Sequence, residues 1–471
     1  MKTIYHLLTV VVVCCCITAT LTSCDDYLDN IPKGEKIPTS LDDFSALLAD
    51  EYTNHREDVS QAVYLIGDQY AAEATLNYSR LTRANYTWDT SINRVEENKS
   101  DESAYYVSYG AISTANLILE NIDNMTDCTE TQRRVLAAQA RILRATKYFT
   151  LVNYYSKTYN ASTASEDGGV PLITSADVNA AYTQPSVQEI YDFIVEDLTQ
   201  ALPDLPEQAQ NILYADKASG YALAARVYLQ MGNYSEALSM ANQALAYNDQ
   251  LFDWVALYND NAELLSDAEN YQNIASPMGY FFVENYYYCH GSSAYAGADA
   301  RITLERGDRF EAGDAHFLCR WKQRTVGAET FYERVLRGNF GRGSLTTTEV
   351  WLIKAECQAR TGDVNGAMQA LNEFRQKRIL PDVYQDLTAD NATEAVKQIV
   401  KVKADALITT HIPFCDLRRQ NLDPTYATTL TKTVNGQTIT LAPDSYLWTM
   451  AIPQGAQKNS GNGTVTQNVD K

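Results

Sequence analysis

Apolar residues recur every three or four positions from residue 218 to residue 245, and this spacing predicts two helices. The first helix carries small apolar side chains along one face, namely Ala218, Ala222, Ala225 and Leu229. Gly232 stands where the end of a helix favours a left-handed residue, and Asn233 can cap a second helix. We therefore predict a helical hairpin.

The same arrangement returns between residues 350 and 378. Ala355 and Ala359 lie on one predicted helix, and Gly362 precedes Ala367 by the same interval that separates Gly232 from Ala237. Small residues at facing positions let two helices approach closely, and the spacing resembles a tetratricopeptide repeat. The two hairpins are far apart in the sequence, so they cannot be tandem neighbours. We predict a helical-repeat scaffold interrupted by long insertions.

Capping-box pairs mark the starts of further helices, at Ser40 with Asp43, Thr129 with Gln132, and Ser186 with Glu189. Strand patterns are short and few: one lies near residues 280–289, and a second pair spans residues 431–441 with a turn at Asn435-Gly436. The predicted fold class is therefore mainly α. Its scaffold of tetratricopeptide-like hairpins covers about residues 103–247 and 347–410.

Two segments lack the helical period. Residues 77–102 are polar and punctuated by aromatic residues, and residues 248–346 are rich in Tyr, Gly, Asn and Ser. A long segment of this kind between two hairpins is usually either disordered or functional, and it has too many aromatic residues for disorder. We predict that both segments form loops with short strands. The chain after Lys458 is predicted to be mobile.

The N-terminus carries an export signal. Residues 1–23 have a charged start and an apolar run, and Leu21-Thr22-Ser23-Cys24 forms a lipobox. The apolar run is shorter than the roughly 20 residues that a membrane-spanning helix needs. We expect cleavage before Cys24, lipidation of Cys24 and anchoring in outer-membrane lipid. Residues 24–39 then form an extended tether, and residues 40–471 form a single domain.

Charge narrows the choice of partner. The formal net charge is −21 at pH 7, which argues against nucleic acid and against an anionic membrane surface as partners. Arginine is nevertheless dense between Arg301 and Arg342, so an anionic ligand remains open there.

The cysteines of the exported part do not form an obvious framework. Besides Cys24 they are odd in number and have no metal-like spacing: Cys128, Cys289, Cys319, Cys357 and Cys415. Cys128 and Cys357 are predicted to be small buried residues. A Cys289–Cys319 disulfide is left open.

Taken in order, several stretches resemble the SusD/RagB family of outer-membrane lipoproteins. They include SCDDYLDNIPKGE, YGAISTANLILENID, RVLAAQARILRATKYFTLVNYY, GGVPLIT and ADKASGYALAARVYLQMGNYSEAL, followed by Asp308-Arg309 and Asp416-Leu417-Arg418-Arg419. The C-terminal third departs from the family pattern, with ALITTHIPFC before Asp416 and with Ala451-Ile452-Pro453 near the end. Asp25-Asp26 resemble the surface-export signal of Bacteroidetes lipoproteins.

The resemblance implies a protein that captures glycan and delivers it to a partner TonB-dependent transporter of the SusC type. It further implies that the helical half docks on the transporter and that the segments 77–102 and 248–346 face the ligand. A peptide-capturing RagB-like protein and an adhesive structural lipoprotein are the alternatives.

Candidate binding residues are aromatic, because sugars stack their apolar faces on rings while polar side chains bind the hydroxyls. The predicted ligand-binding residues are Tyr86, Trp88, Asn93, Tyr286, Tyr287, Tyr288, Tyr295 and Trp321. The other three tryptophans, Trp254, Trp351 and Trp448, have apolar or helical neighbours and are predicted to be structural. Most of the 32 tyrosines are expected to pack between helices.

Nothing in the chain favours an enzyme. There is no HExxH, no G-x-S-x-G and no phosphate-binding glycine loop, and only five His are present, of which His6 lies in the signal. We therefore predict no catalytic residues, no metal site and no cofactor.

Overall fold

The computed structural model describes residues 38–99, 103–267, 274–291, 301–336 and 341–470. The signal segment 1–23, the lipidation residue Cys24, the tether as far as residue 37 and the candidate Tyr295 lie outside the described residues. Within the described ranges, no helix is both long enough and apolar enough to cross a membrane.

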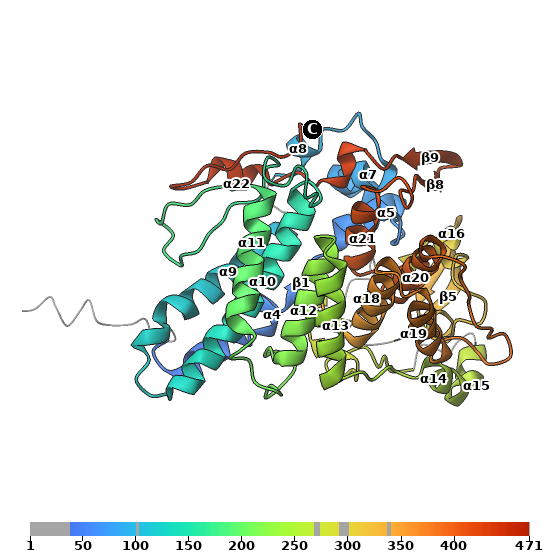
Figure 1. The fold of residues 1–471 in the computed structure, drawn as a ribbon. Helices are drawn as coiled ribbons and strands as arrows, with labels where there is room; N and C mark the ends of the chain where they lie inside the picture. Colours follow the sequence, from blue (N-terminus) through green and yellow to red (C-terminus); the bar gives the residue numbers. More distant parts are fainter. Residues whose placement is uncertain (1–37, 100–102, 268–273, 292–300, 337–340, 471) are drawn as a thin grey trace, which may run out of the picture.

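Helices dominate the described chain, which confirms the predicted mainly α fold class. The longest ones stand side by side in Figure 1 and form a row that continues from α9 to α20. They are α9 (Ser103–Asn121), α10 (Glu130–Tyr155), α11 (Val187–Ala201), α12 (Lys217–Gln230), α13 (Tyr234–Tyr247), α18 (Thr347–Arg360), α19 (Val364–Gln376) and α20 (Ala392–Ala406). Each helix of the row contacts its neighbours, and the main hydrophobic core lies along these contacts.

The two repeat hairpins, α12–α13 and α18–α19, have the predicted turns. Gly232 and Gly362 adopt φ angles of 76° and 99°, and Asn233 and Asp363 cap the helices that follow. Although they are separated in the sequence, the hairpins are neighbours in space because α13 packs directly on α18. The insertion between them therefore leaves the helical row and returns to it.

All three predicted capping boxes are present. The helix that starts at Ser40 was expected to run through Glu51, but it ends as α3 (Leu41–Leu48), and α4 (Glu51–Asn54) follows as a separate helix. The division occurs because Asp50 starts a new helix by accepting hydrogen bonds from the backbone of Tyr52 and Thr53.

The prediction of a loop over residues 77–102 is wrong. This part of the chain contains short helices after α5 (Ser60–Ile66), namely α6 (Glu73–Tyr78), α7 (Arg80–Thr87) and α8 (Arg94–Glu97). Helices of one or two turns are too short to display an apolar period. Their starting signals are the caps Ser79 and Asn93, which the sequence does contain.

The insertion is less loop-like than predicted. Its described residues form four short α-helices, α14 (Trp254–Asp260), α15 (Ala262–Ser266), α16 (Leu304–Gly307) and α17 (Ala315–Arg320). Its largest sheet has the order β4-β6-β5, from β4 (Arg301–Ile302), β6 (Glu329–Arg334) and β5 (Trp321–Val326). The strand expected near residues 280–289 is present as β2 (Asn285–Tyr287), paired with β7 (Leu345–Thr346). A further short pair joins β1 (Arg56–Glu57) to β3 (His290–Gly291).

The C-terminal part returns across the helical row. Helix α21 (Ile412–Gln420) precedes the predicted hairpin of β8 (Leu430–Val434) and β9 (Gln437–Leu441), and a short helix α22 (Gln454–Lys458) follows. The chain beyond Lys458 was predicted to be mobile, and this is wrong. Asn468 donates to the carbonyls of Tyr155 and Gly169, and the Tyr182 hydroxyl donates to the carbonyl of Ser460.

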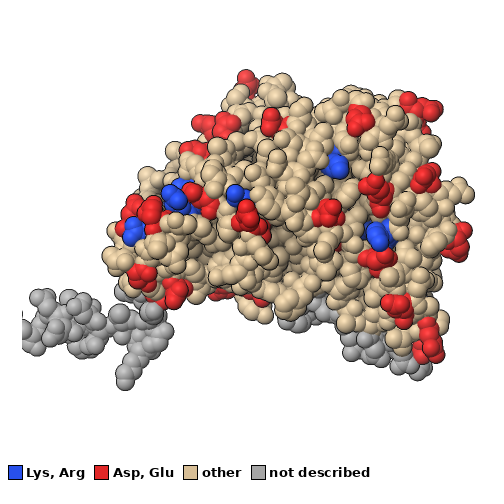
Figure 2. All heavy atoms as spheres, turned by 60° about the horizontal axis from the view of Figure 1, so that its bottom comes forward, with Lys and Arg blue, Asp and Glu red and all other residues tan. Residues whose placement is uncertain are grey.

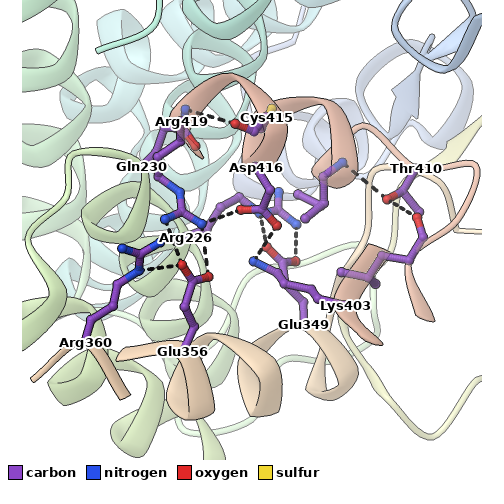
Figure 3. A network of polar contacts seen from close by, with 12 residues as sticks. Arg226, Gln230, Glu349, Glu356, Arg360, Lys403, Thr410, Cys415, Asp416 and Arg419 are labelled. Atoms are coloured by element: carbon purple, nitrogen blue, oxygen red, sulfur yellow. Dashed lines mark hydrogen bonds and ion pairs between the residues drawn. The ribbon is translucent and has the colours of Figure 1, made fainter. Parts of the chain in front are cut away.

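A buried network of ion pairs joins α18, α20 and α21 (Figure 3). Glu356 pairs with Arg360 at 2.7 Å and with Arg419 at 2.8 Å. Asp416 pairs with Arg419 and with Lys403, both at 2.9 Å. Because each of these carboxylates has cationic partners, the network fixes the three helices relative to one another. The Asp416-Leu417-Arg418-Arg419 stretch is thus part of the scaffold.

Candidate ligand-binding site

The predicted aromatic residues that the structure describes are buried. Trp88 is 7% exposed, Trp321 is 2% exposed, and Tyr86 and Tyr286, Tyr287 and Tyr288 are also buried. A side chain with so little exposed surface has no ring face left for a sugar. The expectation that Trp88 lies on an exposed polar loop is therefore corrected.

Trp88 is held from several sides. It ends α7 in a left-handed conformation, with φ of 53°, and its indole Nε1 donates to the carbonyl of Leu65 at 2.8 Å. The ammonium of Lys432 lies 4.3 Å from the centre of the Trp88 ring and 4.2 Å from that of Tyr86. Burial lowers the pKa of Lys432 to about 7. These contacts make Trp88 and Tyr86 the support between α7 and β8.

The remaining predicted residues also have structural contacts. The Asn93 side chain caps α8 by accepting from the backbone of Val95 and Glu96. Trp321 starts β5 and packs in a small core with Ile302 and Ile408. The structural role predicted for Trp254 and Trp448 is confirmed, since both are buried. Trp351 is half-buried, and its Nε1 donates to the carbonyl of Asp249.

Next to the Trp88 support lies a hollow of about 670 Å³, which we call the α20–α21 hollow. Its lining residues come from the end of α5, from α16 and the residues after it, from helices α20 and α21, and from the segment leading into β8. Its apolar lining includes Ile66, Phe310, Val400, Pro413, Leu417 and Tyr426, and its polar lining includes Asp308, Arg309, Lys397, Lys401, Gln420, Thr425 and Thr428. The lining thus combines apolar groups with hydroxyl, amide and charged groups.

Ion pairs form the rigid side of the hollow. The buried guanidinium of Arg306 donates to Asp68 at 2.6 Å and to Asp405 at 2.8 Å. Burial is the main influence on Asp405 and raises the pKa of its carboxyl. Since Arg306 already binds both carboxylates, these groups position the lining and are not free for a ligand.

Other polar groups of the lining either lack a hydrogen-bond partner among the described residues or lie at the surface. The Nε2 of Gln420 is buried and has no hydrogen-bond partner among the described residues, and the residue is only 6% exposed. Such a donor gains free energy when a ligand oxygen accepts from it. Lys397 and Lys401 are exposed one turn apart on α20, and Arg309 pairs with Glu305 at 3.1 Å on the surface.

The rings of this hollow were missed from the sequence. Phe310 is half-buried and lies under the guanidinium of Arg306, and Tyr426 is half-buried and lies beside Arg360. Both follow stretches that the sequence did mark, Asp308-Arg309 and the Asp416 element. An aromatic residue close to a stretch that carries the family resemblance is the signal that could have found them.

The cysteines form no disulfide within the described chain. Cys289 and Cys319 are free and buried, so the pairing left open is not formed. Cys357 is buried as predicted, whereas Cys128 is only half-buried. Among the residues placed by the structure, no group of three His, Cys, Asp or Glu side chains is arranged to hold a metal ion.

Comparisons with known proteins agree with this architecture. Residues 26–229 match the family model SusD-like_3, described as "Starch-binding associating with outer membrane". The chain is 30% identical over 207 residues to SusD-like protein P2 of Formosa agariphila, a match that covers 43% of this chain and only 37% of that relative.

Solved structures match over nearly the whole chain. A SusD superfamily protein from Bacteroides vulgatus superposes with a TM-score of 0.69 at 18% identity, covering 92% of this chain and 99% of that one. A laminarin-binding SusD-like protein gives a TM-score of 0.61 at 16% identity, covering 92% of this chain and all of that one. The protein therefore has a fold made of a helical-repeat scaffold with a folded insertion, and it shares this fold with the matched structures. Residues 26–229 thus match the SusD-like family model, and nearly the whole chain has the fold of SusD superfamily structures, in agreement with the resemblance of its sequence.

Proposed function

We propose that this protein is a cell-surface, carbohydrate-binding lipoprotein that captures glycan in the α20–α21 hollow. The observation that carries the proposal is the composition of that hollow. Half-buried Phe310 and Tyr426 offer apolar surface, and the unpaired amide of Gln420 and the hydroxyls of Thr425 and Thr428 offer hydrogen bonds. Sugars have the same mixture of an apolar face and hydroxyl edges.

The expected affinity of one such hollow is modest. Covering about 50 Å² of a ring face contributes on the order of 1 kcal/mol, or roughly a fivefold change in the dissociation constant. Weak single sites are sufficient for a capture protein if one long glycan is bound at several points. Carbohydrate binding is further supported by the matched family description and by the laminarin-binding structural neighbour.

The proposal also includes the transfer of the captured glycan and the location of the protein in the cell. The captured glycan is passed to a SusC-like TonB-dependent transporter, and the protein is held on the outer membrane by acyl chains on Cys24. The support for this comes from the lipobox in the sequence and from the words "associating with outer membrane" in the family description. In this proposal the protein has no catalytic role.

The test is calorimetric titration of residues 25–471 with laminarin, starch, xylan and a mixture of peptides. Tyr426→Ala and Gln420→Ala are expected to weaken binding of the glycan about fivefold each. Tyr78→Ala is the matched control, because Tyr78 is 93% exposed and is not part of the hollow, and it should change nothing. Binding of peptides with no binding of any glycan would replace this proposal by peptide capture.

A further inference from the structure

A second hollow of about 670 Å³ opens where the loop entering α12 and the loop leaving α13 meet β2. We call it the α12–α13 hollow. It shares no lining residue with the α20–α21 hollow. The loops that line it lie at the lower ends of α12 and α13 in Figure 1, apart from α20 and α21, which line the first hollow.

Most residues that line the second hollow are uncharged and polar. Side-chain amides predominate, from Gln208, Gln210, Asn211, Asn248, Gln250 and Asn285. Three tyrosines and the carboxylates of Glu207 and Asp216 complete the polar part, and none of the described lining residues is Lys or Arg. Amides and tyrosine hydroxyls both donate and accept hydrogen bonds, which suits a ligand made of hydroxyl groups.

Some of these groups make the wall rigid and others remain at the surface. The Nδ2 of Asn285 donates to the carbonyl of Gly279 at 2.9 Å, and the Nδ2 of Asn248 donates to the carbonyl of Val283 at 3.2 Å. Gln208 and Gln250 are exposed at the mouth. A fixed wall with exposed amides at its rim can bind a chain without a large loss of conformational entropy.

An aromatic ring stands at the mouth as well. Tyr247, at the end of α13, is 42% exposed, and its ring is backed by the nearly parallel ring of Tyr221, 6.2 Å away between centres. Phe281 is 91% exposed and follows Tyr280, whose carbonyl accepts from Asn285 in the wall. The hollow thus has a supported, partly exposed ring in its lining, that of Tyr247.

Electrostatics indicates which sugars this hollow can take. Its charged lining groups, Glu207 and Asp216, are both carboxylates, so an acidic sugar would be repelled. Figure 2 turns the bottom of Figure 1 toward the viewer and shows Asp and Glu scattered over this face, with few Lys or Arg and wide uncharged areas between them. A neutral glycan meets no such cost.

We propose that the α12–α13 hollow is a second glycan-binding site, selective for neutral oligosaccharides. The inference rests on the proposed function, because it assigns a second site to the same class of ligand. Two sites on one chain let a long polysaccharide bind at both, and the second contact then forms at a high effective concentration. Long neutral chains are consequently retained more strongly than short ones.

The experiment uses residues 25–471 and neutral hexasaccharides prepared from laminarin, starch and xylan, with oligogalacturonate as the acidic comparison. Calorimetry of the unsubstituted protein should give a stoichiometry of two for a bound hexasaccharide. Tyr247→Ala combined with Gln208→Ala should reduce it to one, and Tyr426→Ala should weaken only the other site. All substituted residues are exposed or half-buried, and an unchanged unfolding temperature verifies that the fold is intact.

The outcomes separate the two proposals. If the unsubstituted protein binds only one hexasaccharide, and the variant with Tyr247→Ala and Gln208→Ala still binds one, the second site is overturned and the proposed function is kept. Equal binding of oligogalacturonate at the Tyr247 site would overturn its selectivity. If Tyr426→Ala has no effect while Tyr247→Ala abolishes binding, the second site stands and the α20–α21 hollow is not the capture site. An absence of binding by every glycan would overturn both.

Discussion

Trp88 supports the α20–α21 hollow from behind. Its indole donates to the carbonyl of Leu65, and the next residue, Ile66, lines the hollow. Its ring also covers the ammonium of Lys432, two residues after the lining residue Leu430. The position of two lining segments therefore depends on one buried side chain that a ligand does not reach.

We predict that Trp88→Ala lowers the free energy of unfolding by about 3–5 kcal/mol, because it leaves a cavity and frees the Leu65 carbonyl. Urea unfolding followed by circular dichroism measures the change. Tyr78→Ala, at a 93% exposed position, should stay within about 0.5 kcal/mol of the unsubstituted protein. A stable Trp88→Ala protein that has lost glycan binding would instead indicate that the ring contacts the ligand.

The prediction of an exposed Trp88 failed for a physical reason. The neighbours of Trp88 are polar because they cap short helices or form turns, as Asp89 does by accepting from Ser91, and this polarity resembles that of an exposed loop. Gln420 and Tyr426 gain their significance only from the approach of α20 to α21, a tertiary contact that no local pattern contains.

At the scale of elements, the two repeat turns depend on glycine conformation. Gly232 has a positive φ, and no atom lies within 4 Å of the position of an added Cβ. We predict that Gly232→Ala destabilises the protein by about 1 kcal/mol through backbone strain alone. Gly110→Ala is the matched control: this exposed glycine inside α9 is also free of neighbours, and alanine there should stabilise by about 0.5–1 kcal/mol. Thermal unfolding of both variants tests the opposite signs.

The elements that could be predicted from the sequence are those whose start or turn depends on a few neighbouring residues. The capping boxes, the glycine turns and the Asn435-Gly436 hairpin depend on residues adjacent in the chain, and all of them are present. The contact of α13 with α18 could not be predicted, because it closes over an insertion of about a hundred residues whose own fold had no clear period.

Substitution of Glu356 tests whether the ion-pair network in Figure 3 holds the helices together. Burial alone would raise the pKa of its carboxyl, but Arg419, Arg360 and Lys403 hold that pKa well below its usual range. We predict that Glu356→Gln costs about 3–5 kcal/mol near neutral pH, since it leaves buried cations without their partner. Lys377→Ala breaks an exposed pair with Asp253 and should cost less than about 1 kcal/mol.

The same carboxylate makes stability depend on pH. Its pKa is lower in the folded than in the unfolded protein, so its contribution is complete above the usual glutamate pKa and is lost as the pH falls below it. The difference in unfolding free energy between the unsubstituted protein and Glu356→Gln should therefore shrink in urea titrations below about pH 4.5. A difference that is constant from pH 7 to pH 3 would contradict this assignment.

At the scale of the whole molecule, capture of glycan is useful only if the chain stays at the cell surface. The described residues begin at residue 38, and the helical row and both hollows belong to the folded part that follows. The proposed function assigns attachment to the segment before residue 38, where Cys24 and Asp25-Asp26 are the two signals predicted from the sequence.

We predict that Cys24→Ser removes incorporation of labelled palmitate and moves the protein from the membrane fraction to the soluble fraction, because stable anchoring needs at least two acyl chains. Replacing Asp25 and Asp26 by Ala should keep the label and the membrane association but reduce cleavage by protease added to intact cells. The paired variants distinguish anchoring from surface export. If Cys24→Ser stayed in the membrane fraction, the protein would be held there by another contact, and the lipoprotein assignment would fail.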